Sequence, residues 1–393
     1  MDDHVEIEER VTPLELFFDL VFVFAITQVT GLLSDDPTWS GLLRGLLVLA
    51  ALWWSWAAYA WLTNTLDPEE GAVRLAMLGA MGAMLVAALA VPQAFGDDAV
   101  LFGIAYLAVR VLHLVLYSIA GRGDPDLSRA VLRLVPPATV GPALIVAAGF
   151  LDGAAQVGLW AAALAIDYVG VLVGGMRGWR VSPAHFAERH GLVVIIALGE
   201  SIVAVGIGVS GLALELDVVT AALLGVAVAA ALWWSYFDWV AIVAARRLGE
   251  ARGAARARLA RDAYSYLHLP MVAGIVLFAL GVKKTLEHVG EPLETIPALG
   301  LSCGVALYLL AHVALRLRIG GGLGRGRPTA ALVLIGLTPL FLEVPAFAAV
   351  AIVAVVCAAL IAYEALRYRE QRAEIRREAP TTRSQPRGGA AST

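Results

Sequence analysis

Charged residues are scarce in this sequence, where Asp, Glu, Lys and Arg together make up 16% of 393 residues. Soluble domains carry about 25% charged residues, so the composition is unusual for a globular protein in water. The chain also lacks a Walker loop, a nucleotide-binding glycine pattern and a G-x-S-x-G elbow, and nothing in it indicates nucleic-acid binding. Its two cysteines, Cys303 and Cys357, lie in apolar segments without redox or ligand spacing. We expect buried packing residues there, not a disulfide.

Apolar residues are abundant instead. They make up 60% of the chain, and the mean hydropathy is +0.77. Apolar runs of about 18 residues or more recur along nearly the whole sequence, and each is long enough to cross about 30 Å of hydrocarbon. The sequence therefore predicts an all-α polytopic membrane protein. The twelve candidate spans are residues 14–33, 41–63, 72–92, 99–119, 131–151, 155–175, 187–209, 218–244, 263–282, 297–315, 330–344 and 346–366.

The eleventh candidate span is short and contains Pro339 near its centre. Proline interrupts the hydrogen bonding of a helix, so we expect a bent helix or a re-entrant hairpin formed with the twelfth span. An even number of spans leaves both chain ends on the same side of the membrane, and ten spans would satisfy this condition as well as twelve.

The placement of arginine predicts which ends of the spans face the cytoplasm. Arginines gather in four loops on the side of the N-terminus and in the C-terminal tail, and the loops on the other side are acidic, with Lys283 and Lys284 as exceptions. We therefore expect both chain ends to be cytoplasmic. The acidic N-terminus differs from the basic start of a signal peptide, so no cleavable signal is expected. The arginines assigned to inner loops are Arg122, Arg129, Arg133, Arg177, Arg180, Arg189, Arg246, Arg247, Arg252, Arg256, Arg258, Arg261, Arg316, Arg318, Arg325 and Arg327.

An internal repeat is visible in the sequence ALWWS, which occurs at 51–55 on the second span and at 231–235 on the eighth. Asp19 lies 34 residues before the first tryptophan of one copy, and Glu200 lies 33 residues before that of the other. An even number of spans separates the two copies, so both have the same orientation in the membrane and the repeat is parallel. The alternative is that the motif is retained only for packing. The predicted parts are a cytoplasmic segment 1–13, six-helix repeats at 14–175 and 176–366, and a basic, partly disordered cytoplasmic tail 367–393.

Ionisable side chains inside the spans are the candidate functional groups, because a charge there costs about 2.5–3.5 kcal/mol without a partner or a water-filled path. Glu15 and Asp19 share one face of the first span. The guanidinium group of Arg110 stays charged and therefore needs a hydrogen-bond acceptor, and Asp19 and Glu200 are the deepest carboxylates available. His113, one turn from Arg110, is a candidate proton relay. The candidate pathway residues, mostly in the cytoplasmic half, are Glu15, Asp19, Arg110, His113, Asp167, His190, Glu200, Asp238 and His268.

These groups also have simpler interpretations. Glu15 and Asp238 can reach interfacial water, and His268 and His312 can be hydrogen-bond partners at a helix end or between helices. Arg110 and its carboxylate can form a static pair that fixes helix register. No pair of the candidate residues has the spacing of a ligand motif, so we expect no metal and no cofactor.

Three segments carry a resemblance to a known family: PLELFFDLVFVFA at 13–25, ERHGLVVIIALGESI at 188–202 and RDAYSYLHLP at 261–270. Through them, residues 10–366 resemble the bacterial low temperature requirement A family. The resemblance implies a multi-pass protein of the bacterial inner membrane that is linked to growth in the cold. It implies no settled biochemical activity.

The segment FFDLVFVFAIT at 17–27 also resembles the F-S-D motif helix of the endolysosomal and bacterial potassium-channel family, which is built from six-helix repeats. Phe18 replaces the motif serine here, and GES at 199–201 stands where a second F-S-D would be. This resemblance implies a pore or pathway role for the first and seventh helices and no potassium selectivity.

The leading hypothesis is a transporter or channel for an ion or small solute, with proton coupling as one option and a path walled by spans 1, 4 and 7. The alternative is a non-transporting membrane sensor or scaffold for adaptation to cold. A lipid-acting enzyme has only Glu200-Ser201 with His113 or His190 to support it, so we expect no enzyme. The expected partners are the lipid bilayer, anionic lipid headgroups at the basic loops and a small ion or solute, with homo-oligomerisation left open.

Overall fold

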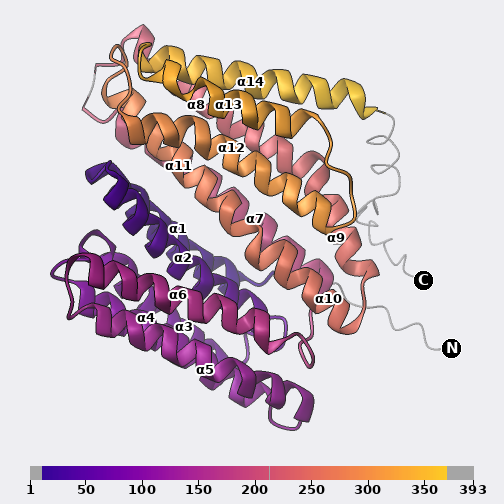
Figure 1. The fold of residues 1–393 in the computed structure, drawn as a ribbon. Helices are drawn as coiled ribbons and strands as arrows, with labels where there is room; N and C mark the ends of the chain where they lie inside the picture. Colours follow the sequence, from indigo (N-terminus) through magenta and orange to yellow (C-terminus); the bar gives the residue numbers. More distant parts are fainter. Residues whose placement is uncertain (1–10, 212, 370–393) are drawn as a thin grey trace, which may run out of the picture.

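Helices form nearly all of the protein in a computed structural model that describes residues 11–211 and 213–369. They lie as long rods across the molecule (Figure 1). The helices are α1 (Pro13–Asp35), α2 (Trp39–Leu62), α3 (Gly71–Ala90), α4 (Ala99–Ala120), α5 (Pro125–Ala148), α6 (Gly153–Gly174), α7 (Pro183–Gly208), α8 (Leu216–Ser235), α9 (Ala241–Glu250), α10 (Gly253–Leu259), α11 (His268–Glu287), α12 (Thr295–Arg318), α13 (Gly326–Phe341) and α14 (Ala346–Arg367).

The helix starts follow local capping chemistry. At α1, the Thr12 side chain accepts from the backbone N–H of Glu15 at 3.3 Å, and the Glu15 carboxylate accepts from the backbone N–H of Thr12 at 2.9 Å. This capping box, with Pro13 in the first turn, fixes where α1 begins. At α5, the N-cap Asp124 accepts from the backbone N–H of Leu127, which with the nearby Arg180 guanidinium holds the pKa of Asp124 below its usual value.

Eleven helices among the described residues are long and apolar enough to cross a membrane, counting α8 with α9 and α10 with α11 as single rods. The predicted eleventh span, 330–344, corresponds to α13, which has 16 residues and reaches about 24 Å at 1.5 Å per residue. Pro339 lies in the last turn of α13 and not at its centre, so it ends the helix more than it bends it. The described residues therefore contain eleven or twelve candidate membrane spans.

The outer surface of the bundle is apolar. Large hydrophobic side chains such as Leu75, Leu132 and Leu223 are 71%, 68% and 65% exposed. A soluble protein rarely presents so many contiguous apolar side chains, whereas a surface facing lipid requires them. The charged side chains Glu15, Asp19 and Arg110 lie inside, so the polarity is inverted relative to a soluble bundle.

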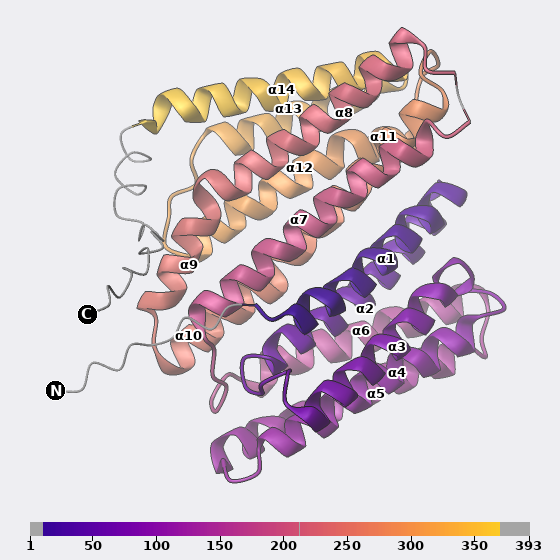
Figure 2. The ribbon, with the colours of Figure 1, turned by 180° about the vertical axis from the view of Figure 1, so that it is seen from behind.

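The chain forms two halves that lie side by side, α1–α6 and α7–α14 (Figures 1 and 2). They meet along α1 and α2 of the first half and α7 and α11 of the second. Two π-helical stretches, Tyr236–Val240 after α8 and Ala260–Tyr266 before α11, interrupt the rods of the second half. Such stretches often mark functional positions in helices.

Successive spans run in opposite directions, so α1 begins and α14 ends at the same end of the molecule (Figure 1). The connections at this end carry arginines, including Arg122, Arg177 and Arg252, and we refer to it as the arginine-rich end. The connections at the opposite end contain Asp36 and Asp98. Most of the predicted N-terminal segment 1–13 and of the predicted tail 367–393 lies outside the described residues.

The two copies of the ALWWS motif have unlike surroundings. Trp53 and Trp54 on α2 are 0% and 5% exposed, because α2 packs against both halves. Trp233 and Trp234 on α8 are 45% and 40% exposed. The motif therefore fills the centre of the molecule in one copy and faces outward in the other.

Close helix packing in the second half depends on glycines of α11 and α12. A Cβ on Gly304 would lie 2.8 Å from both the Gly274 carbonyl oxygen and the Phe278 backbone nitrogen.

We expect Gly304→Ala to lower the free energy of unfolding by about 1–3 kcal/mol, because the backbones of α11 and α12 must separate. Thermal melting in detergent measures this. Gly336→Ala, where a Cβ meets open space on α13, is the matched control, and an equal loss in both variants would contradict the packing argument.

Candidate functional site

A buried network of charges joins α1 to α7. Nη1 of Arg189 donates to Oε1 of Glu15 at 3.1 Å, and its Nη2 donates to Oδ1 of Asp19. All three side chains are at most 1% exposed. Nε2 of His185 lies 3.0 Å from Oε1 of Glu15, and when protonated His185 would balance the second carboxylate. The one-turn spacing of Glu15 and Asp19 thus lets one guanidinium hold both.

Neighbouring groups of α2 complete this network. Nε1 of Trp56 donates to Oδ1 of Asp19 at 2.8 Å, and Oγ1 of Thr63 accepts from Nη1 of Arg189 at 3.2 Å. The guanidinium carbon of Arg189 lies 5.6 Å from the centre of the Trp56 ring, within the range of a cation–π contact. The network therefore ties α1, α2 and α7 together where the two halves meet.

Arg189 was misplaced by the sequence analysis, which assigned it to an inner loop. Helix α7 begins at Pro183, so Arg189 lies almost two turns inside it and is 0% exposed. The early charged residues of α7 lower its local hydropathy, and this shifted the predicted start to residue 187. The Ser182-Pro183 pair is a helix-start signal that could have corrected it.

The predicted partner of Arg110 was wrong. Nη2 of Arg110 on α4 donates to Oδ1 of Asp167 on α6 at 2.9 Å, and both side chains are 1% exposed. Helix α2 separates Arg110 from α1, since Tyr59 of α2 stacks on Phe18 at a ring distance of 5.0 Å and faces the His113 ring at 5.5 Å. The interface of α1 and α7 is accordingly bordered by α2 and α11, and α4 is not its third wall.

Glu200 lies deeper than these pairs, in the middle of α7. Its Oε2 accepts from Oγ1 of Thr27 on α1 at 2.6 Å, and the residue is 1% exposed. Thr27 is eight residues beyond Asp19 on α1, about 12 Å along the helix, so Glu200 and Asp19 are not adjacent. Among the buried carboxylates of the described chain, Glu15, Asp19, Asp167 and Glu364 form ion pairs, whereas Glu200 forms none.

The candidate histidines are held by backbone carbonyls. His113 lies 3.1 Å from the Ala58 oxygen, His190 lies 2.8 Å from that of Phe186, and His268 lies 3.0 Å from that of Ala263. The His190 and His268 rings are 5.3 Å apart at the interface of the halves. Nε2 of His268 also lies 2.8 Å from the Tyr236 hydroxyl, at the end of α8.

Asp238 is half-buried in the π-helical stretch after α8. His312, predicted to be a hydrogen-bond partner at a helix end or between helices, bonds the Tyr308 carbonyl oxygen of its own helix at 2.8 Å. Among the described residues, no group of three or more His, Cys, Asp or Glu side chains has the geometry to hold a metal ion.

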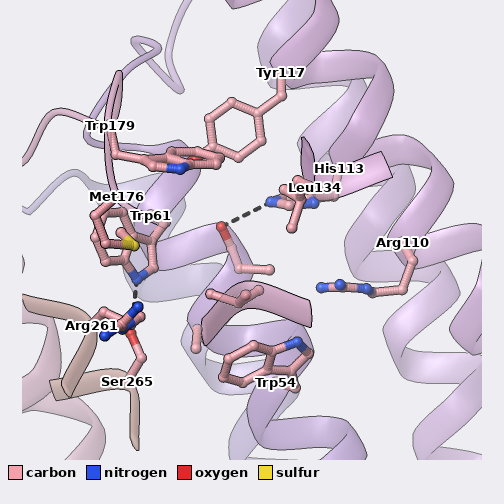
Figure 3. A pocket seen from close by; sticks show the side chains of 13 residues that line it. Trp54, Trp61, Arg110, His113, Tyr117, Leu134, Met176, Trp179, Arg261 and Ser265 are labelled. Carbon is pink, nitrogen blue, oxygen red and sulfur yellow. Dashed lines mark hydrogen bonds between the residues drawn. The ribbon is translucent and has the colours of Figure 1, made fainter. Parts of the chain in front are cut away.

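A cavity of about 60 Å³ lies beside Arg110 (Figure 3). Helices α2, α4, α5 and α6 surround it, loop 175–182 covers it toward the arginine-rich end, and Arg261 and Ser265 reach it from the second half. Figure 3 shows Arg110 and Arg261 extending toward it from opposite sides, with Trp54 between them. Of the predicted pathway residues, only Arg110 and His113 line it.

Apart from Asp238, the candidate residues are thus divided among three places: the interface of α1 and α7, the interior of the first half, and the aromatic core between the halves. Glu15 and Asp19 lie in the Arg189 network, and Glu200 lies with Thr27 further along the same interface. Arg110, Asp167 and His113 lie within the first half. His190 and His268 occupy the aromatic core between the halves, where His190 is 5.0 Å from the Trp56 ring and 5.1 Å from that of Tyr264.

Long apolar helices, an apolar exterior and buried, neutralised charges define the class: a polytopic helical membrane protein. The chain belongs to the bacterial low temperature requirement A (LtrA) family, whose model, described as bacterial low temperature requirement A protein, matches residues 10–362. The chain is also 33% identical over 303 residues to the uncharacterized protein RA0937 of Rhizobium meliloti (strain 1021), an alignment that covers 70% of this chain and 69% of the relative. No solved structure matches the chain.

Proposed function

We propose that this LtrA-family protein transports an ion or small solute across the bacterial inner membrane, with the interface of α1 and α7 as its path. The observation that carries the proposal is the isolation of Glu200, a 1% exposed carboxyl group that forms no ion pair with a described residue. A charged carboxylate is costly at this depth, so binding of a proton or a cation stabilises it. A group that must take up and release such a partner is suited to coupling or conduction.

The surroundings of Glu200 support this role. The hydroxyl of Thr27 on the facing helix donates to its carboxylate at 2.6 Å, which orients the group across the contact between α1 and α7. The Arg189 network lies nearer the arginine-rich end of the same interface, where its two carboxylates are compensated. One interface therefore carries fixed, neutralised charges at one level and an unpaired carboxyl group at another.

The proposal includes the parallel six-plus-six repeat and a cytoplasmic position for the arginine-rich end. The packing partners support the repeat: α1 packs against α2 and α3, and α7 packs against α8 and α11, the second and third spans of each half. Likewise α2 packs against α6, and α8 packs against α14, the sixth span of each half. The excess of arginine at one end favours its cytoplasmic orientation.

Flux into sealed vesicles tests the proposal. Purified protein is reconstituted with a pH-sensitive dye inside, and K⁺, Na⁺ and H⁺ gradients are imposed in turn, with protein-free vesicles as the baseline. The proposal expects flux above that baseline under at least one gradient. Flux at the baseline under every gradient would contradict a path for these ions.

Thr27→Val gives a graded version of this test. The substitution removes the hydroxyl donor to Glu200 at nearly constant volume, and a hydrogen bond to a charged group contributes about 1.5–3 kcal/mol. Since about 1.4 kcal/mol is tenfold in rate, we expect flux to fall about tenfold. Thr220→Val is the matched control, because Thr220 on α8 donates only to the Leu216 carbonyl. Unchanged flux in Thr27→Val would remove this residue from the path.

A non-transporting sensor or scaffold is the second candidate. It is favoured by the burial of the Arg189 network, whose four side chains are at most 5% exposed and hold the two halves together. This alternative expects no flux in any gradient, and it expects substitutions of Asp19 to reduce the yield of folded protein without a separate functional defect.

A further inference from the structure

We propose that the cavity beside Arg110 is a binding site for a small organic anion, a short-chain carboxylate in size and chemistry. This goes beyond the transport proposal, because it concerns a different place in the fold and is measured at equilibrium without a gradient. A failure to bind and a failure to transport are therefore separate results.

The hydrogen-bond donors of the cavity favour an anion. Two guanidinium groups, Arg110 and Arg261, are among its lining residues, and no carboxylate is among those that the structure describes there. Asp167 neutralises Arg110 through Nη2, and Asp262, outside the cavity, neutralises Arg261 through Nε at 2.7 Å, while Nε of Arg110 is buried without a hydrogen-bond partner in the described chain. The Tyr117 hydroxyl, 1% exposed, is another lining donor that is buried without a hydrogen-bond partner in the described chain. Buried donors in this state are costly unless a ligand or water accepts from them.

The walls of the cavity favour an ion with an apolar part. Trp54, Trp61 and Trp179 line it together with Leu134 and Met176 (Figure 3). A strongly hydrated ion such as phosphate would lose its water against these indole rings, whereas a short alkyl chain would bury apolar surface there. The volume of about 60 Å³ corresponds to roughly four or five water-sized spheres. A carboxylate of about five non-hydrogen atoms is of that size.

The position of the cavity favours entry from the arginine-rich end. Loop 175–182 covers it with Met176 and Trp179 and presents Arg177 and Arg180 on its exposed side. Arg180 is held to Asp124 at 2.8 Å, and an Arg133 side chain donates to the Arg177 carbonyl. Exposed arginines at the cover of a cavity raise the local concentration of anions.

Tryptophan fluorescence of the detergent-purified full chain tests the proposal, because three lining residues are tryptophans. The probes are propionate, its neutral analogue propionamide, its cationic analogue propylammonium, and inorganic phosphate, all at equal ionic strength. We expect a saturable change with propionate alone. No saturation with propionate, or equal saturation with any of the other three probes, would overturn the proposal.

Substitutions in and around the cavity show whether the fluorescence change with propionate arises there. Ala58→Leu fills the cavity from α2 without changing charge, and saturation by propionate should be lost. Leu134→Phe fills it from α5 and replaces the first variant if that one is not monodisperse in gel filtration. Arg261→Gln should weaken binding about tenfold, since it removes one of the two cations. Arg129→Gln, 67% exposed and outside the cavity, should leave binding unchanged. Retention of full propionate affinity in a monodisperse filled variant would place the ligand elsewhere and overturn the assignment.

Discussion

Replacing Arg189 by Gln is expected to lower the free energy of unfolding by about 3–5 kcal/mol, because it leaves two buried carboxylates without their guanidinium. Arg189 is 0% exposed and bonds both Glu15 and Asp19. Neither carboxylate can reach water when its partner is removed. Thermal melting in detergent, together with the yield of monodisperse protein, measures the loss.

Two further variants separate lost charge from lost packing. Arg189→Lys should recover only part of the stability, because an ammonium group cannot reproduce the planar fork that serves two carboxylates. The triple variant Arg189→Gln, Glu15→Gln and Asp19→Asn should be more stable than Arg189→Gln alone, since no uncompensated charge remains. Arg129→Gln, a 67% exposed residue, is the control and should melt as the wild type does. A triple variant as unstable as the single one would show that packing, not charge, explains the loss.

The helices could be predicted from the sequence because a membrane span requires a long apolar run. Span 99–119 corresponds to α4 (Ala99–Ala120), and span 346–366 corresponds to α14 (Ala346–Arg367). The errors fall where helices begin with polar turns. Span 131–151 is α5, which begins at Pro125, and the rod that contains 263–282 begins at Gly253. Hydropathy misses such turns, whereas capping residues mark them.

The partners of the buried charges could not be predicted, because hydropathy and spacing do not specify which helices are neighbours. Arg110 was assigned to Asp19 or Glu200 by depth alone, but Tyr59 and its helix stand between α4 and α1. The pairing with Asp167 depends on the packing of α5 against both α4 and α6, which the sequence does not state. The choice of Glu15 and Asp19 as candidates was nevertheless useful, since both belong to the network at the interface of the halves.

Replacing Glu200 by Gln is expected to reduce flux to the level of protein-free vesicles. Gln has nearly the same volume and still accepts a hydrogen bond from Thr27, so the packing of α1 on α7 is kept. It carries no negative charge and cannot exchange a proton or bind a cation as a carboxylate does. Glu200→Asp, which keeps the carboxyl group at a shorter reach, should retain part of the flux.

A matched variant shows whether the effect belongs to this position. Glu343→Gln makes the same chemical change at an exposed residue after α13 and should leave flux unchanged. Both proteins should melt within the range of the wild type, because neither change breaks an ion pair among the described residues. A lower melting temperature in Glu200→Gln alone would indicate a structural role for the carboxyl group.

The most direct test of the account is therefore one comparison of initial flux rates in dye-loaded vesicles that contain equal amounts of wild-type, Glu200→Gln or Glu343→Gln protein under the same ion gradient. The account predicts flux in the wild type and in Glu343→Gln and none above the protein-free baseline in Glu200→Gln. Equal flux in the wild type and in Glu200→Gln would contradict a path that depends on the unpaired carboxyl group between α1 and α7.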